Sequence, residues 1–81
     1  MAIKLVFLGR LEDVAGGSER AVNAVDATLG AVLQLLEPEL AAALCGERIR
    51  LAVNGTLVAD RVSLALEDGD ELAFLPPVSG G

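Results

Sequence analysis

The chain has 81 residues, enough for one small domain, and twelve Asp and Glu against six Lys and Arg give it a formal net charge of −6. This charge argues against binding to nucleic acid, which draws its affinity from Lys and Arg at the phosphates. With no histidine and one cysteine, the chain cannot form nucleophile–histidine pairs, an internal disulfide, or zinc sites of four cysteines or of two cysteines and two histidines. The composition is poor for an enzyme acting alone, and we expect no tightly bound cofactor or metal.

Hydropathy favours a folded domain, because apolar residues make up 53% of the chain. No apolar run approaches the roughly 20 residues that cross a bilayer. The N-terminal sequence enters a strand-like segment at once and lacks the features of a signal peptide. We therefore expect a soluble cytoplasmic protein that has no membrane partner.

The first third of the sequence predicts two strands separated by a loop. Residues 3–8 are apolar at nearly every position and β-prone, which is typical of a strand buried on both faces at the centre of a sheet. Residues 9–18 include Gly16 and Gly17 and are expected to form a loop. Residues 19–25 are more polar and predict a weaker strand at the edge of the sheet.

A helix is predicted after Thr28, whose hydroxyl can accept a hydrogen bond from an otherwise unpaired amide. Pro38 interrupts this helix because proline has no amide hydrogen. It can begin a short second helix over residues 39–45, with Gly46 as the expected C-terminal cap. The apolar stripe expected to pack on the sheet has helical spacing and consists of Leu29, Val32, Leu33 and Leu36.

The second half of the sequence predicts short strands joined by tight turns. Residues 48–53 alternate between polar and apolar side chains, which indicates a strand. Asn54-Gly55 is a strong hairpin signal that leads into a short strand at residues 56–59. An irregular crossing follows over residues 60–67. Its expected anchors in the core are Val62, Leu64 and Leu66.

Residues 71–75 predict the last strand, which follows a turn at Asp68-Gly69 and ends before two prolines. Burying both this strand and the first one places them side by side in the middle of a sheet, with the helix packed across one face. This is an α+β arrangement, the β-grasp or ubiquitin-like fold, with a mixed sheet of about five strands and one main helix. We expect residues 1–77 to form this domain and residues 78–81 to form a flexible tail.

Alternation along the two central strands assigns their side chains to opposite faces of the sheet. The residues expected to face the helix are Ile3, Leu5, Phe7, Leu72 and Phe74. Those expected on the opposite face, which no element of this chain can cover, are Val6, Leu8, Ala73 and Leu75. An uncovered apolar patch usually marks an interface, so we expect a partner to bind there. Scattered apolar side chains on an ordinary surface are the alternative.

Side-chain chemistry has few candidates. Cys45 is interpreted as a small buried apolar residue rather than a nucleophile, because the chain supplies no base for it. Gly16-Gly17 lacks the spacing of a phosphate-binding loop. We interpret two groups of charged residues as solvated loops. The first, for which a Mg²⁺ or acid–base site is the alternative, consists of Glu67, Asp68, Asp70 and Glu71. The second consists of Glu12, Asp13 and Arg20.

The C-terminal segment Pro-Pro-Val-Ser-Gly-Gly offers a different kind of chemistry. Gly80 and Gly81 carry no Cβ, so the tail can enter a narrow channel of another protein. Its reactive group is the Gly81 carboxylate, which becomes an electrophile once ATP converts it to an acyl adenylate, and a sulfur nucleophile then gives a thiocarboxylate. A frayed glycine-rich terminus is the alternative interpretation. The only lysine, Lys4, would be remote from the tail if the first and last strands are parallel.

Residues 68–81, Asp-Gly-Asp-Glu-Leu-Ala-Phe-Leu-Pro-Pro-Val-Ser-Gly-Gly, closely resemble the C-terminus of molybdopterin synthase small subunits, also called molybdopterin-converting factor subunit 1. The likeness covers the whole chain, including the apolar first strand, the loop at residues 10–16, the helix after Thr28 and the segment 53–55. The ending Phe-x-Pro-Pro-Val-[Ser/Thr]-Gly-Gly is its specific part. The resemblance implies a β-grasp fold and a sulfur carrier that is not an enzyme on its own.

The resemblance also implies partners and a reaction sequence. An E1-like adenylyltransferase would use ATP to adenylate Gly81, and sulfur from a donor protein would convert it to a thiocarboxylate. The tail would then enter the large synthase subunit and give its sulfur to cyclic pyranopterin monophosphate, with two small subunits flanking a dimer of large ones. One departure is Glu12-Asp13, where the family often has Arg-Glu. The partner interface implied for this chain consists of Leu8, Leu57, Leu75, Pro76, Pro77 and Val78.

Three other functions stay open at this point. A sulfur carrier for thiazole, cysteine or tRNA thiolation shares the fold and the Gly-Gly end, although the Pro-Pro-Val stretch argues against it. A ubiquitin-like modifier conjugated to lysines is the second. The third is a plain β-grasp interaction module that does not use its C-terminus.

Overall fold

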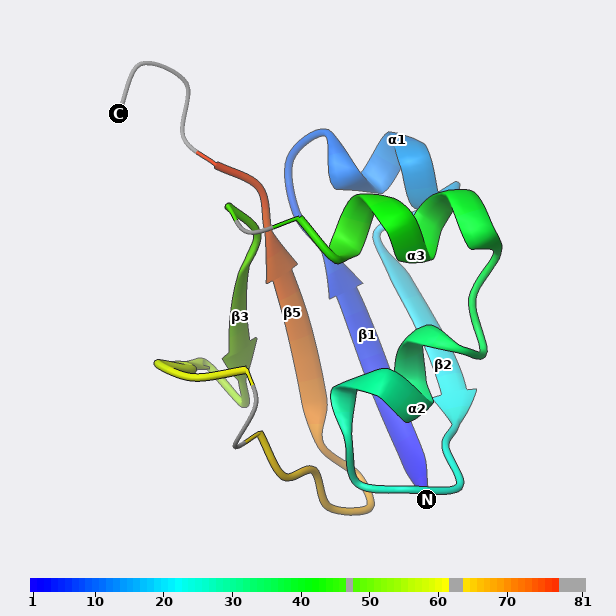
Figure 1. Cartoon of the computed structure of the whole chain (residues 1–81), viewed down its shortest axis with the longest axis vertical. Helices are drawn as coiled ribbons and strands as arrows, with labels where there is room; N and C mark the ends of the chain where they lie inside the picture. Colours follow the sequence, from blue (N-terminus) through cyan, green and yellow to red (C-terminus); the bar gives the residue numbers. More distant parts are fainter. Residues whose placement is uncertain (47, 62–63, 78–81) are drawn as a thin grey trace.

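The computed structural model describes residues 1–46, 48–61 and 64–77. In these ranges the chain forms a mixed sheet with helices packed against it (Figure 1). The sheet has five strands in the described part of the chain, in the order β2-β1-β5-β3-β4. The elements in chain order are β1 (Ala2–Phe7), α1 (Leu11–Ala15), β2 (Glu19–Asn23), α2 (Leu29–Leu33), α3 (Pro38–Leu44), β3 (Arg50–Val53), β4 (Thr56–Leu57) and β5 (Glu71–Leu75).

The two most apolar strands, β1 and β5, lie side by side at the centre of the sheet, as their composition predicts, and they run parallel. Their register pairs Leu5 with Leu72 and Phe7 with Phe74. Strand β2 pairs with β1, and β3 with β5, in the antiparallel sense. This mixed sheet with its parallel central pair is the predicted α+β, β-grasp arrangement.

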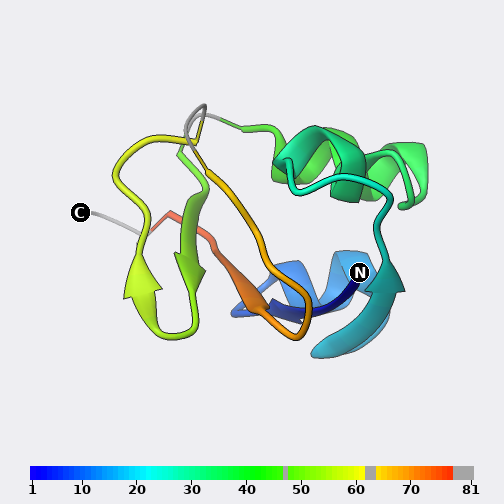
Figure 2. The same ribbon diagram turned by 90° about the horizontal axis from the view of Figure 1, so that it is seen from below.

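The core lies between the sheet and the helices α2 and α3, which occupy one side of it (Figure 2). Phe7 and Phe74 stack at its centre, with ring centroids 5.6 Å apart. The five side chains predicted to face the helix are all buried, and the helices contribute Val32, Leu40 and Leu44. Because each large apolar side chain contributes about 1.5–3 kcal/mol when it is buried, this layer holds the fold together.

The helical segment is broken at Pro38, as predicted, but its first part is shorter than the apolar stripe suggests. The Thr28 hydroxyl caps α2 by accepting a hydrogen bond from the Ala31 amide at 3.2 Å. Helix α2 ends at Leu33, whereas Leu36 is buried in the turn that follows. The short second helix predicted after Pro38 is confirmed as α3, whereas α2 is shorter than the main helix expected from the sequence.

The predictions for the end of α3 are wrong in two respects. Cys45 is exposed rather than buried, and it forms the C-cap with a right-handed backbone, so Gly46 does not close the helix. The carbonyls at this end are instead bound by a side chain from outside the helix, Arg61. Its guanidinium donates to the carbonyl oxygens of Cys45, Gly46 and Ile49. Arg61 thereby binds the carbonyl of the C-cap residue, which the helix leaves unpaired, and two carbonyls of the segment between α3 and β3.

The expectation of a loop over residues 9–18 is also wrong, because this segment contains α1. One buried side chain, Leu11, attaches α1 to the core, and Gly16 ends the helix with a φ of 79°. Five residues with one buried position show no helical periodicity, so the sequence pattern carries no signal for this helix. None of the helices in the described ranges has the length and apolar character needed to cross a membrane.

Strand boundaries differ from the predicted ones by at most two residues at an end. Strand β5 is as predicted, β1 begins and ends one residue earlier, and β2, β3 and β4 are each two residues shorter. The hairpin at Asn54-Gly55 is confirmed, since these residues have φ values of 50° and 84°. Leu64 and Leu66 pack on the core as predicted, whereas Val62 lies outside the described residues.

Candidate functional site

The face of the sheet turned away from α2 and α3 carries a continuous apolar patch, hereafter the docking face. Small side chains occupy its centre, where Ala52 of β3 and Ala73 of β5 lie in register. Leu8 and Leu57 project from the patch and are 41% and 61% exposed. The docking face consists of Val6, Leu8, Ala52, Leu57, Ala73 and Leu75.

Strand alternation finds most of these residues from the sequence. The four side chains predicted to face away from the helices all belong to the docking face, and Leu57, expected from the family resemblance alone, lies there as well. Ala52 was missed, although it alternates with Leu51 along β3 and the same rule could have found it. That a partner binds this face stays a prediction.

The chain leaves the sheet at the edge of the docking face. Strand β5 ends at Leu75, and the half-buried Pro76 and Pro77 follow it. Pro76 approaches Gly9 so closely that a Cβ on Gly9 would lie 2.9 Å from the Pro76 Cγ. Gly9 also has a φ of +56°, a left-handed conformation that glycine adopts without strain. The root of the tail is therefore seated against the loop that follows β1.

Because β1 and β5 are parallel, the tail leaves from the end of the sheet opposite to Lys4. Lys4 lies in register with Glu71, four residues before Leu75 on β5, which corresponds to about 13 Å along the strand. Its Nζ atom lies 3.3 Å from a carboxylate oxygen of Glu19. The conditional expectation that Lys4 is remote from the root of the tail is therefore met. Three predicted site residues lie outside the described part of the chain: Val78, Gly80 and Gly81.

The carboxylates before β5 are exposed, as expected, and they also fasten the turn to its neighbours. Asp70 accepts hydrogen bonds from the side-chain amide of Asn54 and from the backbone amide of Glu67. These bonds, that of Asn54 first, hold the pKa of Asp70 below its ordinary value against a smaller opposing effect of desolvation. Asp68 accepts a hydrogen bond of 2.6 Å from the Ala2 amide. Across the described residues, no group of three or more His, Cys, Asp or Glu side chains is placed to hold a metal ion.

The second charged group is also engaged in part, contrary to the expectation of purely solvated charge. Arg20 donates from Nη1 to a Glu37 carboxylate oxygen at 2.8 Å and from Nη2 to the Ala15 carbonyl at 2.9 Å. The hydrogen bond from Arg20 is the main reason why the pKa of Glu37 lies below its ordinary value. Arg20 thereby links the end of α1 to the turn before α3, whereas Glu12 and Asp13 are exposed.

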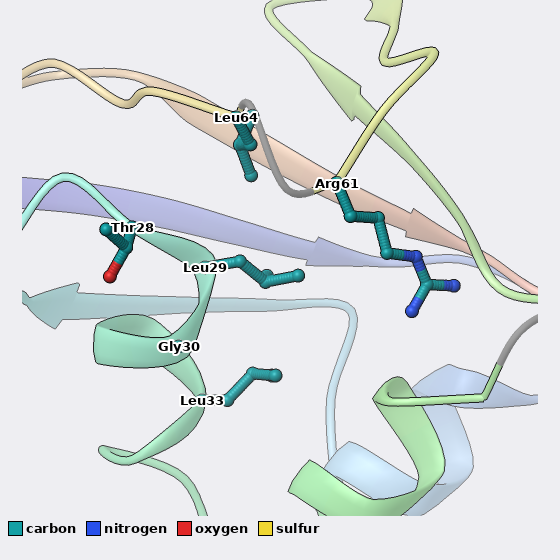
Figure 3. A pocket seen from close by; sticks show the side chains of 6 residues that line it. All are labelled: Thr28, Leu29, Gly30, Leu33, Arg61 and Leu64. Atoms are coloured by element: carbon teal, nitrogen blue, oxygen red, sulfur yellow. The ribbon is translucent and has the colours of Figure 1, made fainter.

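A recess of about 360 Å³ lies on the helix side of the molecule (Figure 3). The Arg61 guanidinium extends away from the leucines of this recess (Figure 3), toward the carbonyls at the end of α3. The Thr28 hydroxyl is already engaged as the cap of α2. Among the described residues that line it, the recess is thus an apolar hollow without an available acid, base or metal ligand. It is lined by Thr28, Leu29, Gly30, Leu33, Arg61 and Leu64.

A small β-grasp domain with a bare sheet face beside the root of its C-terminal segment is a ubiquitin-like protein. The family model described as the ThiS family matches residues 5–81, nearly the whole chain. The chain therefore belongs to the ThiS family.

Relatives and solved structures agree with this assignment over their full lengths. The molybdopterin synthase sulfur carrier subunit of Escherichia coli (strain K12) is 37% identical over 82 aligned residues, covering 98% of this chain and 99% of that protein. The crystal structure of SAMP1 from Haloferax volcanii is similar with a TM-score of 0.80 and 32% identity, covering 100% of both chains. A chain in the complex of subunits 1 and 2 of molybdopterin-converting factor from Helicobacter pylori is similar with a TM-score of 0.69 and 29% identity, again covering 100% of both.

Proposed function

We propose that this chain is the sulfur carrier and small subunit of a molybdopterin synthase, and that it is not catalytic on its own. The observation that carries the proposal is the continuity of the docking face with the tail: Leu75 belongs to this face, and Pro76 follows it directly. A partner that covers the docking face thereby receives the tail at a fixed place. Full-length similarity to the sulfur carrier subunit of Escherichia coli supports the choice of complex.

The reacting group of the proposed carrier is the carboxyl of Gly81. An E1-like adenylyltransferase transfers AMP from ATP to this carboxylate and releases pyrophosphate, so ATP is used by that enzyme and is not held by the carrier. Sulfur that a donor protein releases at the oxidation level of sulfide attacks the acyl carbon, AMP leaves, and a thiocarboxylate forms. Inside the synthase this group gives its sulfur to cyclic pyranopterin monophosphate to build the dithiolene of molybdopterin.

The proposed assembly is a cytoplasmic heterotetramer in which two small subunits flank a dimer of large ones. Residues 1–77 act as the body of the carrier and residues 78–81 as the arm that delivers Gly81. Glycine at positions 80 and 81 suits a narrow channel because it has no side chain. The remote position of Lys4 supports the chemistry, since an amine beside the tail would intercept the activated carboxyl. The docking residues are Leu8, Leu57, Leu75, Pro76 and Pro77, with Val78 and Gly80 following in the tail.

Intact mass measures the chemical step directly. The chain is incubated with its activating enzyme, ATP and a sulfur donor, and we expect the mass gain that corresponds to one oxygen replaced by sulfur. A variant without Gly81 should show no such gain but should unfold at the same temperature, because a terminal tail contributes little burial. If the unchanged chain gains no mass, the proposed sulfur transfer is refuted.

A pair of exposed apolar residues tests the docking step. Leu57→Asp places a charge within the docking face and should weaken binding to the purified large subunit at least about tenfold. Its folding should be nearly unchanged, since Leu57 is 61% exposed. Val25→Asp is the matched control, because Val25 is 91% exposed and lies beyond β2, away from the docking face. Equal affinities of the two variants, measured by titration calorimetry, would contradict docking through this face.

A further inference from the structure

Arg50 lies at the tail end of the docking face. It opens β3 and is in register with Leu75, the last residue of β5. Residues paired across antiparallel strands have their side chains on the same face of the sheet, so Arg50 projects on the side of the docking face. Figure 1 shows the start of β3 next to the end of β5, from which the tail departs. Arg50 is exposed.

The charge of Arg50 is isolated on this side of the sheet. Among the described residues, none forms an ion pair with it. Elsewhere on the outward face, Lys4 is in register with Glu71 at the far end of β5 and contacts Glu19 at 3.3 Å. Glu19 lies on β2, which β1 and β5 separate from β3. Glu71 is four residues from Leu75, or about 13 Å along the strand, which exceeds the screening length of about 8 Å at physiological ionic strength.

Arg50 has a second cation close to it in sequence, although the chain as a whole is acidic. Arg48, two residues earlier, is also exposed. The formal net charge of the whole chain is −6, so most of its surface repels an acidic partner. A carboxylate on a partner is therefore favoured where it meets Arg50 and disfavoured where it meets the acidic parts of the surface.

Because Arg50 lies at the border of the apolar docking face, it restricts the chemistry of a partner surface that can cover this face. When a partner seals the docking face, Arg50 loses water, and a charge taken out of water needs an opposite charge or several acceptors. The planar guanidinium matches the two oxygens of a carboxylate with two parallel hydrogen bonds. Neutral side chains do not offer this geometry.

We propose that Arg50 is a specificity-determining residue of the docking face, and that it pairs with a carboxylate on the large synthase subunit at the rim of the surface that covers Leu75. The inference rests on the proposed function, which supplies the partner. Because Arg50 is in register with the last residue of β5, this ion pair fixes the position of the tail root relative to the entrance of the partner's channel.

Titration calorimetry with the full chain and the purified large subunit tests the inference. Arg50→Gln should weaken binding at least about tenfold, and Arg50→Glu should weaken it further through repulsion. Lys4→Gln is the matched control on the same face, and it should change the affinity by no more than about twofold, because exposed ion pairs contribute little. Raising the salt concentration should weaken binding of the unchanged chain more than that of Arg50→Gln.

The possible outcomes separate this inference from the function on which it rests. If the unchanged chain binds the large subunit and Arg50→Gln binds equally well or more tightly, the role of Arg50 is overturned and the carrier function stands. If the unchanged chain does not bind, both fail. Circular dichroism shows whether each variant is folded. Restoration of Arg50→Glu binding by a carboxylate-to-lysine change in the large subunit would identify the paired residue and support the proposal.

Discussion

Replacing Gly9 by alanine tests whether the root of the tail depends on close contact with the loop after β1. Gly9 has a φ of +56°, and a Cβ there would lie 2.9 Å from the Pro76 Cγ, whereas carbon atoms pack best at about 3.5–4.0 Å. The left-handed backbone costs an alanine about 1–2 kcal/mol. Relieving the overlap adds roughly 1–2 kcal/mol. We expect Gly9→Ala to lower the free energy of unfolding by about 2–4 kcal/mol.

Gly16→Ala is the control for backbone strain without a clash. Gly16 has a φ of +79°, and nothing lies within 4 Å of the position of its Cβ, so this variant should lose only about 1–2 kcal/mol. The chain contains no tryptophan or tyrosine, so urea unfolding is followed by circular dichroism. The difference between the two variants isolates the contact with Pro76.

Binding provides the second measurement for this pair of variants. Pro76 has to move to admit a methyl group at Gly9, so Gly9→Ala should weaken binding to the large subunit more than Gly16→Ala does. Equal losses of stability in the two variants would refute the inference that Gly9 seats the root of the tail. Equal affinities would show that the seat does not influence docking.

Two further predictions concern the framework behind the docking face. The pKa of Glu37 lies below its usual 4.5 because Arg20 donates to it, so the stabilising effect of this carboxylate is present above the unfolded pKa and is lost as the pH falls through the folded one. Glu37→Gln should therefore flatten the fall in Tm between about pH 5 and pH 3, and a curve merely shifted by a constant amount would contradict this reasoning. Arg61→Met removes the donor to the carbonyls of Cys45 and Gly46 at the end of α3 and of Ile49 before β3, and it should lower the free energy of unfolding in urea by about 1–3 kcal/mol. Arg48→Met, at an exposed position, should change it by less than about 0.5 kcal/mol, and a similar loss in both variants would remove the capping role from Arg61.

The fold could be predicted because its two strongest sequence signals belong to its two central strands. Residues 3–8 and 71–75 are apolar on both faces, and a sheet hides such strands best by placing them together in its middle. The hairpin turn predicted from the residue pair Asn54-Gly55 is also confirmed, because both residues have positive φ. These signals are local in sequence or follow from hydrophobicity alone.

The features that sequence reasoning missed depend on contacts between distant segments. Cys45 is exposed at the end of α3, and its carbonyl is bound by a side chain 16 residues later, Arg61. The helix α1 is held by one buried side chain, Leu11. No periodic pattern in the sequence predicts either feature.

In the candidate site, too, some features could be predicted from the sequence and others could not. Alternation assigns the apolar residues of the docking face, and it also places Arg50 on the outward side of β3. The isolation of Arg50 could not be read from the sequence, because it depends on the separation of β3 from the ion pair of Lys4 and Glu19. That separation exists only once the strand order of the sheet is known.

The parallel pairing of β1 with β5 has a consequence for the newly made protein. These strands are separated by most of the sequence, and closing so long a loop is slow. On the ribosome, β1 can pair with β2 early, but its other neighbour, β5, is absent until residues 71–75 have been made. Since the docking face needs both strands, a polypeptide that ends before β5 does not display it, and a partner that binds this face discriminates against such chains.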